Sequence, residues 1–253
     1  FSMGLVGIVG IGLTRGWLPA MASTAQVVHD TGFAYTLSVI PLFILMGNVA
    51  SVTGMSRRLY DAAYALIGEF RGGLASATVI GCGGFAALSG SSVASALTMG
   101  KVALAEMDRY DYDPRLSTGV VAAGGTLGIL IPPSTGFVIY AILTEQSIGR
   151  LFLAGVLPGI LMLLLFIVAI MVICTIRPGF GPAGPSTTFP QKLRALAGAL
   201  PIVGVIFLTI GGIYGGFFSP VEASAVGAGI VIVIGVLQRS LSLRQFWEAA
   251  KDS

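Results

Sequence analysis

The sequence GGLASATVIGCGGFAALSGSSVASALTMG, at residues 72–100, decides how this chain folds. It carries no charge, and as one straight helix it would be about 43 Å long in a membrane whose apolar core is roughly 30 Å thick. Its centre, Ser89-Gly90-Ser91-Ser92, is a poor helix interior. Two half-length helices that meet at this turn fit better. We therefore predict a re-entrant hairpin over residues 72–107, which enters and leaves the membrane on one side.

Basic residues flank the predicted hairpin on both sides, three before it and three after it: Arg57, Arg58, Arg71, Lys101, Arg109 and Arg115. The positive-inside rule places both flanks in the cytoplasm. A single crossing would separate the flanks, whereas a hairpin keeps them together. The alternative is one kinked span with basic residues on both sides of the membrane.

A second uncharged segment, within residues 116–148, is interrupted by Leu130-Ile131-Pro132-Pro133-Ser134. Proline lacks the backbone donor and clashes with the preceding turn, so two in succession break a helix. Unpaired backbone groups inside a membrane are tolerated only where they are buried in protein or line a wet cavity. We expect the two breaks to meet near the middle of the membrane.

The two breaks have the chemistry of an ion and solute site. A helix that ends offers carbonyls to a cation, and a helix that begins offers N–H groups to an anion such as a carboxylate. Hydroxyls and glycines surround both breaks: Ser89, Ser91, Ser92, Gly124, Gly125, Thr126, Gly128, Ser134 and Thr135. Carbonyls together with hydroxyls suit a desolvated Na⁺, and neither stretch holds an acidic residue for a proton relay. The alternative is that these small residues only let helices pack closely.

Composition places the whole chain in a membrane. Of its 253 residues, 55% are hydrophobic and only 10% are charged, with a mean hydropathy of +0.92, whereas a soluble domain carries about 25% charged residues. The net charge of +3 is too small to indicate a nucleic-acid surface. The two cysteines, Cys82 and Cys174, lie in apolar runs without metal-ligand spacing, so we expect them to be packing residues.

The remaining segments follow from the length of apolar runs, since a span needs about 20 apolar residues. We predict spans at Thr36–Thr53, Leu151–Ile176, Ala195–Tyr214 and Val221–Leu237. Phe1–Leu13 is the tail of a truncated span, and Thr14–Tyr35 is a loop that contains His29. Ser56–Arg71 is an amphipathic helix along the membrane surface, Arg177–Arg194 is a basic linker rich in proline and glycine, and Gln238–Lys251 is a second basic amphipathic segment.

Two polar residues in the spans have simpler roles than ligand binding. We expect Asn48 to make an interhelical hydrogen bond. We expect Glu222, at the start of a span, to be the charge that favours a helix N-terminus.

Several runs of this sequence together resemble the large membrane subunit of tripartite ATP-independent periplasmic (TRAP) transporters. They are LSGSSVAS at 88–95, LGILIPPS at 127–134, SIGRLF at 147–152, AGVLPG at 154–159 and GIYGGFFSPVEA at 212–223. The resemblance implies Na⁺-coupled import of organic acids, such as C4-dicarboxylates or sialic acid, in the inner membrane of bacteria or archaea. It implies a small membrane subunit and a periplasmic substrate-binding protein as partners, and it implies no enzyme activity.

The fold implied by the resemblance is an all-α, inverted-repeat transporter of the elevator type, with a re-entrant hairpin and broken helices. Residues 1–71 would hold scaffold spans and the surface helix, and residues 72–150 half of a transport domain. Residues 151–194 would hold a span and the cytoplasmic linker, and residues 195–253 the start of a second repeat. The similarity of Phe1–Leu13 to Ala223–Val236 fits such repeats.

The resemblance also assigns roles to the residues at the breaks. The expected substrate-binding residues are Ser89, Gly90, Ser91, Ser92, Pro133, Ser134 and Thr135. The expected sodium ligands are Ser89, Ser91, Gly125, Thr126, Gly128, Ile131 and Pro132. No other metal is expected.

This chain is markedly shorter than the family's large subunit, so we expect a fragment of a longer protein. Other interpretations of the sequence are open. One is a related stand-alone Na⁺-coupled anion carrier, and another is a channel or structural subunit. An intramembrane serine enzyme would need a base near Ser89 or Ser91, but His29 lies in a predicted outer loop and Lys101 at the far end of a half-helix.

Overall fold

The computed structural model describes residues 2–33 and 35–253, and these residues form helices and connecting segments without a β-strand. The chain divides into two compact units, Phe1–Ser38 and Val39–Ser253. This boundary differs from the predicted division at residues 71, 150 and 194. The division into scaffold and transport parts stays a prediction.

The first unit consists of α1 (Ser2–Arg15), α2 (Trp17–Gly32) and the short 3₁₀ helix η1 (Tyr35–Ser38). The expected loop at Thr14–Tyr35 is therefore wrong over most of its length, and His29 lies on a helix. The proline that suggested a loop, Pro19, lies in the first turn of α2, where its missing N–H is not needed. A Cβ at Gly12 would lie 2.7 Å from the Trp17 ring, so glycine lets α2 fold back onto α1.

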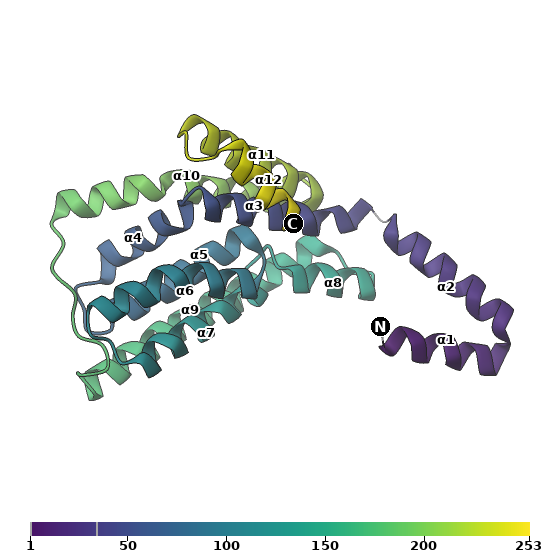
Figure 1. The fold of residues 1–253 in the computed structure, drawn as a ribbon, viewed down its shortest axis with the longest axis horizontal. Helices are drawn as coiled ribbons and strands as arrows, with labels where there is room; N and C mark the ends of the chain where they lie inside the picture. Colours follow the sequence, from purple (N-terminus) through teal and green to yellow (C-terminus); the bar gives the residue numbers. More distant parts are fainter. Residues whose placement is uncertain (1, 34) are drawn as a thin grey trace. The chain divides into compact units, whose positions relative to one another are not determined.

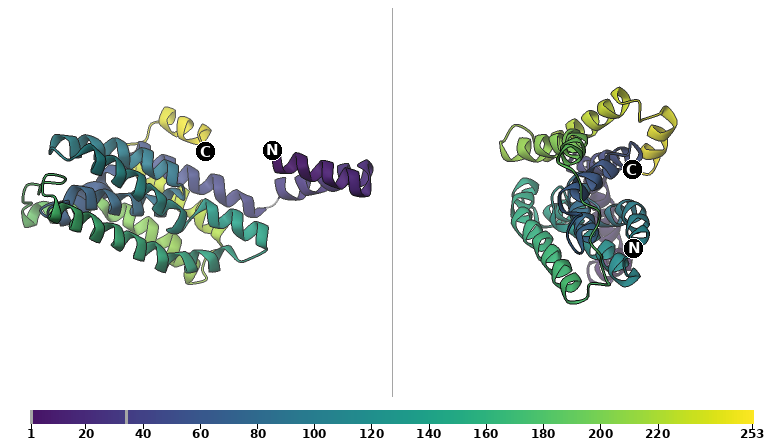
Figure 2. Two further views of the ribbon diagram at one scale, coloured as in Figure 1. Left: turned by 90° about the horizontal axis from the view of Figure 1, so that it is seen from below. Right: turned by 90° about the vertical axis from the view of Figure 1, so that its left-hand side faces the viewer.

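The second unit contains ten helices among its described residues (Figure 1). They are α3 (Val39–Val52), α4 (Met55–Ile67), α5 (Gly73–Ser89), α6 (Ser92–Arg109), α7 (Pro114–Leu130), α8 (Thr135–Thr144), α9 (Ile148–Ile176), α10 (Phe189–Tyr214), α11 (Pro220–Leu237) and α12 (Leu243–Lys251). Most run side by side along one direction (Figure 2).

Length and composition allow five helical segments of the described chain to cross a membrane. They are Tyr35–Val52, Pro114–Thr144, Ile148–Ile176, Phe189–Tyr214 and Pro220–Leu237. The four predicted spans and the broken segment all correspond to these helices. The main difference is at α10, which begins at Phe189 and so takes up the last residues of the predicted linker.

Helix α5 is the centre of the second unit. All of its residues except Ile80 and Gly84 are buried, and it packs against α3, α4, α6, α7 and α9. This is possible because most of its residues are small, so neighbouring helices can approach closely from every side. A Cβ at Gly124 of α7 would lie 2.9 Å from the Cys82 sulfur, for example.

The structure forms the predicted hairpin as two helices, α5 and α6, that pack against each other across a turn at Gly90 and Ser91. That this hairpin enters and leaves a membrane on one side stays a prediction. The residue before α5 and the residue before α7 contact the same segment: the Gly72 N–H donates to the Gly181 carbonyl at 3.0 Å, and the Asp113 N–H, a few residues after α6, donates to the Phe180 carbonyl at 3.1 Å. The single kinked span is therefore wrong, because it would carry these two ends to opposite sides.

Helix α4 corrects the prediction of a surface helix over its first turns. Leu59 and Ala63, from the apolar face that was expected to enter the lipid, are buried against protein, where α4 packs on α5 and α10. Leu66 and Phe70 stay exposed. The spacing of apolar residues along a helix predicts that one face is apolar, but it does not distinguish a face that meets lipid from one that meets other helices.

Residues 177–188 of the proline- and glycine-rich linker form a strap, an extended segment held by hydrogen bonds to other parts of the chain. Its first half accepts the hairpin bonds given above, and the Pro182 carbonyl accepts the Tyr112 hydroxyl at 2.9 Å. Its second half bonds to the end of α4, where the Gly184 N–H donates to the Gly68 carbonyl at 3.0 Å. The strap thus joins the open end of the hairpin to α4.

One carboxylate fixes the second half of the strap. Glu69 Oε1 lies 2.9 Å from the Lys192 ammonium and accepts hydrogen bonds from the N–H and the hydroxyl of Thr187, both at 3.0 Å. Lys192 and these hydrogen bonds lower the pKa of Glu69 to about 2. The stabilisation is therefore complete above about pH 4.5 and is lost as the pH falls towards 2.

We predict that Glu69→Gln loosens the strap without unfolding the protein, because the carboxylate is partly exposed and solvent screens its ion pair. Amide hydrogen exchange in the full-length protein should become faster at Thr187 and Gly184 at neutral pH. Glu248→Gln is the matched control, because Glu248 pairs with Arg244 within α12. Unchanged exchange at Thr187 would contradict the role given to Glu69.

Candidate functional site

The tip of the hairpin is built by a glycine and a serine. Gly90 adopts a left-handed conformation, with a φ of 61°, and its N–H donates to the Ala86 carbonyl at 2.9 Å, which ends α5. Ser91 begins α6, because its hydroxyl accepts a hydrogen bond from the Ala94 N–H at 3.3 Å. The sequence LSGSS is therefore a helix stop followed at once by a helix start.

Two serine hydroxyls face each other behind the tip. Ser89 Oγ lies 3.3 Å from Ser95 Oγ, and both residues are buried. Ser95 also donates to the Ser91 carbonyl at 2.8 Å. Sequence reasoning did not select Ser95, although its place four residues after Ser91 puts both on one face of α6.

The second break leaves carbonyls without their usual donors. Helix α7 ends when the Ile131 N–H donates to the Leu127 carbonyl at 2.8 Å. The next two residues, Pro132 and Pro133, have no N–H, so the carbonyls of Gly128 and Ile129 lack the donors that a continuous helix supplies four residues later.

Ser134 stands at the start of α8 with its hydroxyl free. The side chain is buried at 1% exposure, and within the described residues its oxygen has no hydrogen-bond partner. A buried hydroxyl without a partner is costly, so the Ser134 hydroxyl retains its full capacity for a hydrogen bond at this break.

The two breaks are joined directly. The Thr135 N–H and the Thr135 hydroxyl both donate to the Gly90 carbonyl, each at 3.1 Å. A Cβ at position 90 would lie 2.8 Å from the Pro133 carbonyl oxygen, so only glycine fits this contact. The breaks meet as expected, whereas their place near the middle of a membrane stays a prediction. The contact occupies the Gly90 carbonyl and the donor hydrogen of the Thr135 hydroxyl, which keeps its acceptor lone pairs.

Two glycines of α7 form the surface on which the tip rests. A Cβ at Gly128 would lie 2.7 Å from the Ser92 nitrogen, and a Cβ at Gly125 would lie 2.7 Å from the Ala96 Cβ. These glycines therefore bring α7 into contact with the start of α6. In this structure both glycines let the backbones of α6 and α7 pack closely. Since glycine has no side chain, only their carbonyls could bind an ion, as predicted.

The structure does not bring every predicted site residue to the contact. Thr126 lies on the exposed face of α7, and its hydroxyl donates to the Ala123 carbonyl at 2.6 Å. Ser91 uses its hydroxyl to cap α6, and Ile131 directs its side chain towards Gly83 and Gly159. Pro132 and Pro133 are buried in the break, and Ser92 is half-buried at the tip.

Two further polar predictions hold. The Asn48 amide donates to the Ala249 carbonyl at 3.3 Å and to the Ser253 hydroxyl at 3.1 Å, which is an interhelical bond to α12. Glu222 and Ser219 form a capping box at the start of α11. Both residues have structural roles away from the two breaks.

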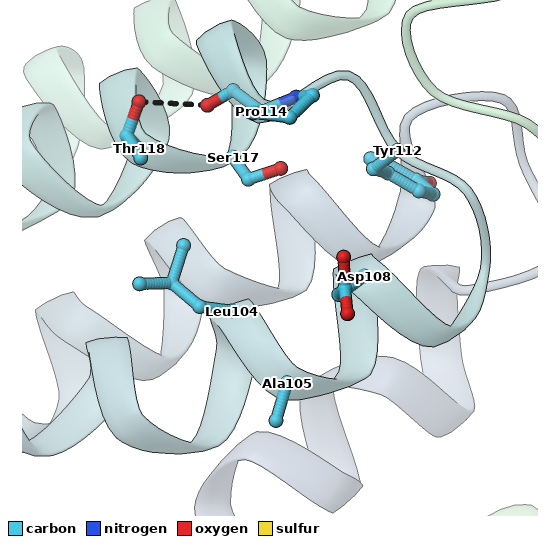
Figure 3. Close-up of a pocket in the computed structure, with 7 residues that line it drawn as sticks. All are labelled: Leu104, Ala105, Asp108, Tyr112, Pro114, Ser117 and Thr118. Carbon is cyan, nitrogen blue, oxygen red and sulfur yellow. Dashed lines mark hydrogen bonds between the residues drawn. The ribbon is translucent and has the colours of Figure 1, made fainter.

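A cavity of about 330 Å³ lies between α6 and α7, near the open end of the hairpin (Figure 3). The hydroxyls of Ser117 and Thr118 in its wall donate to backbone carbonyls, and Tyr112 bonds to the strap. Asp108 is the acidic residue in its lining. With its hydroxyls already bonded, this cavity is a weaker candidate site than the junction of the two breaks.

The groups at the junction have the chemistry of ligands for a cation and for an anion. Carbonyls freed at the end of α7 and the Ser89–Ser95 pair are hard oxygen donors, and the N-termini of α6 and α8 offer N–H groups and positive dipole ends. Acidic, histidine and cysteine side chains do not gather in threes in the described part of the chain. The junction is therefore a site of backbone and hydroxyl groups.

Comparison with known proteins decides the family. The model of the DctM component of tripartite ATP-independent periplasmic transporters matches residues 1–253. The chain belongs to this family. It is 42% identical over 227 residues to the C4-dicarboxylate TRAP transporter large permease protein DctM of Pseudomonas aeruginosa, covering 90% of this chain and 52% of that protein.

Two other relatives differ in the substrates in their names. The ectoine TRAP transporter large permease protein TeaC of Halomonas elongata is 32% identical over 247 residues, which is 97% of this chain and 57% of TeaC. The sialic acid TRAP transporter permease protein SiaT of Haemophilus influenzae is 29% identical over 254 residues, which is 100% of this chain and 41% of SiaT.

The chain matches only part of each relative, and the relatives share one class of protein. The chain spans about half the length of the curated relatives it matches. The relatives are transporter permeases, which are not enzymes, and this agrees with the expectation for this chain. With its apolar helices, this member of the DctM family is a multi-pass membrane protein.

We predict that Gly128→Ala destabilises the junction by about 1–3 kcal/mol, because its Cβ would collide with the backbone of Ser92. Gly119→Ala is the control on the same helix, because within the described structure nothing lies within 4 Å of a Cβ there. Thermal unfolding of the full-length protein in detergent measures both. Equal midpoints for the two variants would contradict the close contact.

We predict that Thr135→Val weakens the link between the breaks by about 0.5–1.5 kcal/mol, because it removes one hydrogen bond to the Gly90 carbonyl. Thr135→Ser keeps the hydroxyl and should stay near wild type. The measurement is thermal unfolding, together with amide exchange at Thr135. A serine variant as unstable as the valine variant would show that the hydroxyl does not matter.

Proposed function

We propose that this chain is part of the permease of a Na⁺-coupled TRAP transporter that imports organic acids across a bacterial or archaeal inner membrane. The observation that carries the proposal is the contact of the two breaks at Gly90 and Thr135, within a chain of the DctM family. A small membrane subunit and a periplasmic substrate-binding protein are the proposed partners.

Coupling to Na⁺ is supported by the donors at the junction. Carbonyl and hydroxyl oxygens are the ligands that broken helices offer to Na⁺ in secondary transporters. The carbonyls of Gly128 and Ile129 and the Ser89 hydroxyl belong to this set. Ser134, with its free buried hydroxyl, is the strongest candidate of the predicted set on the substrate side.

A carboxylate substrate is supported by the helix starts at the same junction. The N-termini of α6 and α8 supply N–H groups without adding acidic side chains. The substrate names of the relatives include C4-dicarboxylate, sialic acid and ectoine. Of these, we propose an organic acid, and a binding protein that delivers it would set the choice among acids.

An inverted-repeat elevator architecture is also part of the proposal. The pattern of an apolar helix followed by a second helix occurs at α1 and α2 and again at α11 and α12. α1 ends at Arg15 and α11 at Leu237, which is the spacing expected from the similarity of residues 1–13 to residues 223–236.

The decisive experiment is uptake by the full-length gene product in proteoliposomes. Labelled organic acids would be tested with and without an inward Na⁺ gradient, and with and without the binding protein. Uptake that needs both supports the tripartite importer. Uptake with Na⁺ alone would indicate a stand-alone carrier, passive flux would indicate a channel, and no Na⁺ effect would refute the ion site.

We predict that Ser91→Ala and Pro132→Ala each weaken Na⁺-dependent uptake while leaving membrane insertion intact. Ser91 caps α6 at the tip, so its loss costs about 1 kcal/mol at the site, and Pro132→Ala restores a donor within the break. Thr118→Ala is the control, because its hydroxyl bonds to α7 outside the junction. Wild-type Na⁺ dependence in both variants would remove the site assignment.

A further inference from the structure

We propose that Gly47 of α3 is a positioning residue for the ion site, because its bare backbone is the surface against which the hairpin tip closes. This inference rests on the proposed Na⁺ coupling. It adds a residue from outside the two breaks, in a helix whose residues were assigned only to scaffold.

The first observation is the contact itself. A Cβ at position 47 would lie 2.5 Å from the Ser89 Cβ and 2.6 Å from the Ser89 Cα. The second of these atoms belongs to the backbone, so no change of rotamer relieves the collision. Any side chain at position 47 must therefore displace the end of α5 by moving Ser89.

A second contact shows that the same face of α3 also meets the other arm of the hairpin. Ser51 Oγ lies 3.4 Å from Thr98 Oγ1 of α6. Gly47 and Ser51 are four residues apart and so lie one above the other on α3. The two residues form one docking face, with Gly47 against the tip and Ser51 against α6.

Helix α3 is held from its other side, so it cannot retreat easily from the tip. Asn48 bonds to Ala249 and Ser253 at the end of α12. A Cβ at Gly227 of α11 would lie 2.6 Å from the Met46 sulfur, which shows how closely α11 packs against α3. A Cβ at position 47 would thus displace the hairpin tip, because α3 itself is held in place.

A side chain at position 47 would disturb the contact between Ser89 and Ser95. Ser89 Oγ faces Ser95 Oγ at 3.3 Å, and a shift of the Ser89 backbone moves one of the two hydroxyls out of this arrangement. Gly47 itself touches no ion. It acts through Ser89, by letting the end of α5 lie where the Ser89 hydroxyl faces Ser95 behind the hairpin tip.

The test compares Gly47→Ala with Gly229→Ala in the full-length transporter. Within the described residues, nothing lies within 4 Å of a Cβ at Gly229, so this change on α11 is the matched control. We expect Gly47→Ala to raise the Na⁺ concentration for half-maximal uptake at least about fivefold, which corresponds to about 1 kcal/mol. Gly229→Ala should leave it unchanged.

Stabilisation by Na⁺ separates a positioning role from a general packing role. The shift in unfolding midpoint on adding NaCl in place of choline chloride should shrink in Gly47→Ala and stay at the wild-type value in Gly229→Ala. A wild-type protein that ignores Na⁺ would refute the proposed coupling. A wild type that responds to Na⁺, with Gly47→Ala responding equally, would refute only the role of Gly47.

A cross-link keeps the inference testable if Gly47→Ala fails to fold. In Ser51→Cys/Thr98→Cys, the two sulfurs would replace oxygens 3.4 Å apart, so the thiols are neighbours when the tip is docked and separate when it moves away. Coupling is reciprocal, so if docking favours Na⁺ binding, Na⁺ must favour docking. We expect Na⁺ to speed disulfide formation at least about twofold over choline. Equal rates, or no disulfide at all, would overturn the inference.

Discussion

The Gly90 carbonyl accepts both hydrogen bonds that Thr135 can donate, and this contact holds together two interruptions of apolar helices. A broken helix inside a membrane is stable only if protein groups replace the hydrogen bonds it loses. Each break here supplies part of what the other lacks, because the end of α5 offers a carbonyl and the start of α8 offers donors. The Ser134 hydroxyl, at the start of α8, is left without a hydrogen-bond partner in the described structure.

Glycine makes this contact possible at several levels. At position 90 it takes a left-handed conformation and leaves room for the Pro133 carbonyl. At Gly47 and Gly128 it lets α3 and α7 reach the backbone of the hairpin tip from two directions. The tip therefore rests on backbone, and its position is set by close packing more than by long side chains.

The strap adds a constraint at the other end of the hairpin. Its first half accepts hydrogen bonds from Gly72, before α5, and from Asp113, in the connection after α6. Its second half bonds to the end of α4. Its composition predicted a linker, since proline and glycine are frequent in it. The bonds that order it come from residues far away in the sequence, such as Glu69 and Tyr112, which no local pattern connects to it.

The sequence by itself determined the membrane class, the spans and the two breaks, because apolar length and the backbone chemistry of Gly90, Pro132 and Pro133 act locally. The contact between the breaks was an expectation from their chemistry, and the tertiary structure decided which groups make it. It missed α2, since Pro19 signals a loop unless its place in the first turn is known. Only the tertiary structure decided that α4 is partly buried, that Thr126 faces outward and that Gly47 meets Ser89. These facts depend on which faces of distant helices pack together, and a pattern within one segment cannot specify its partner.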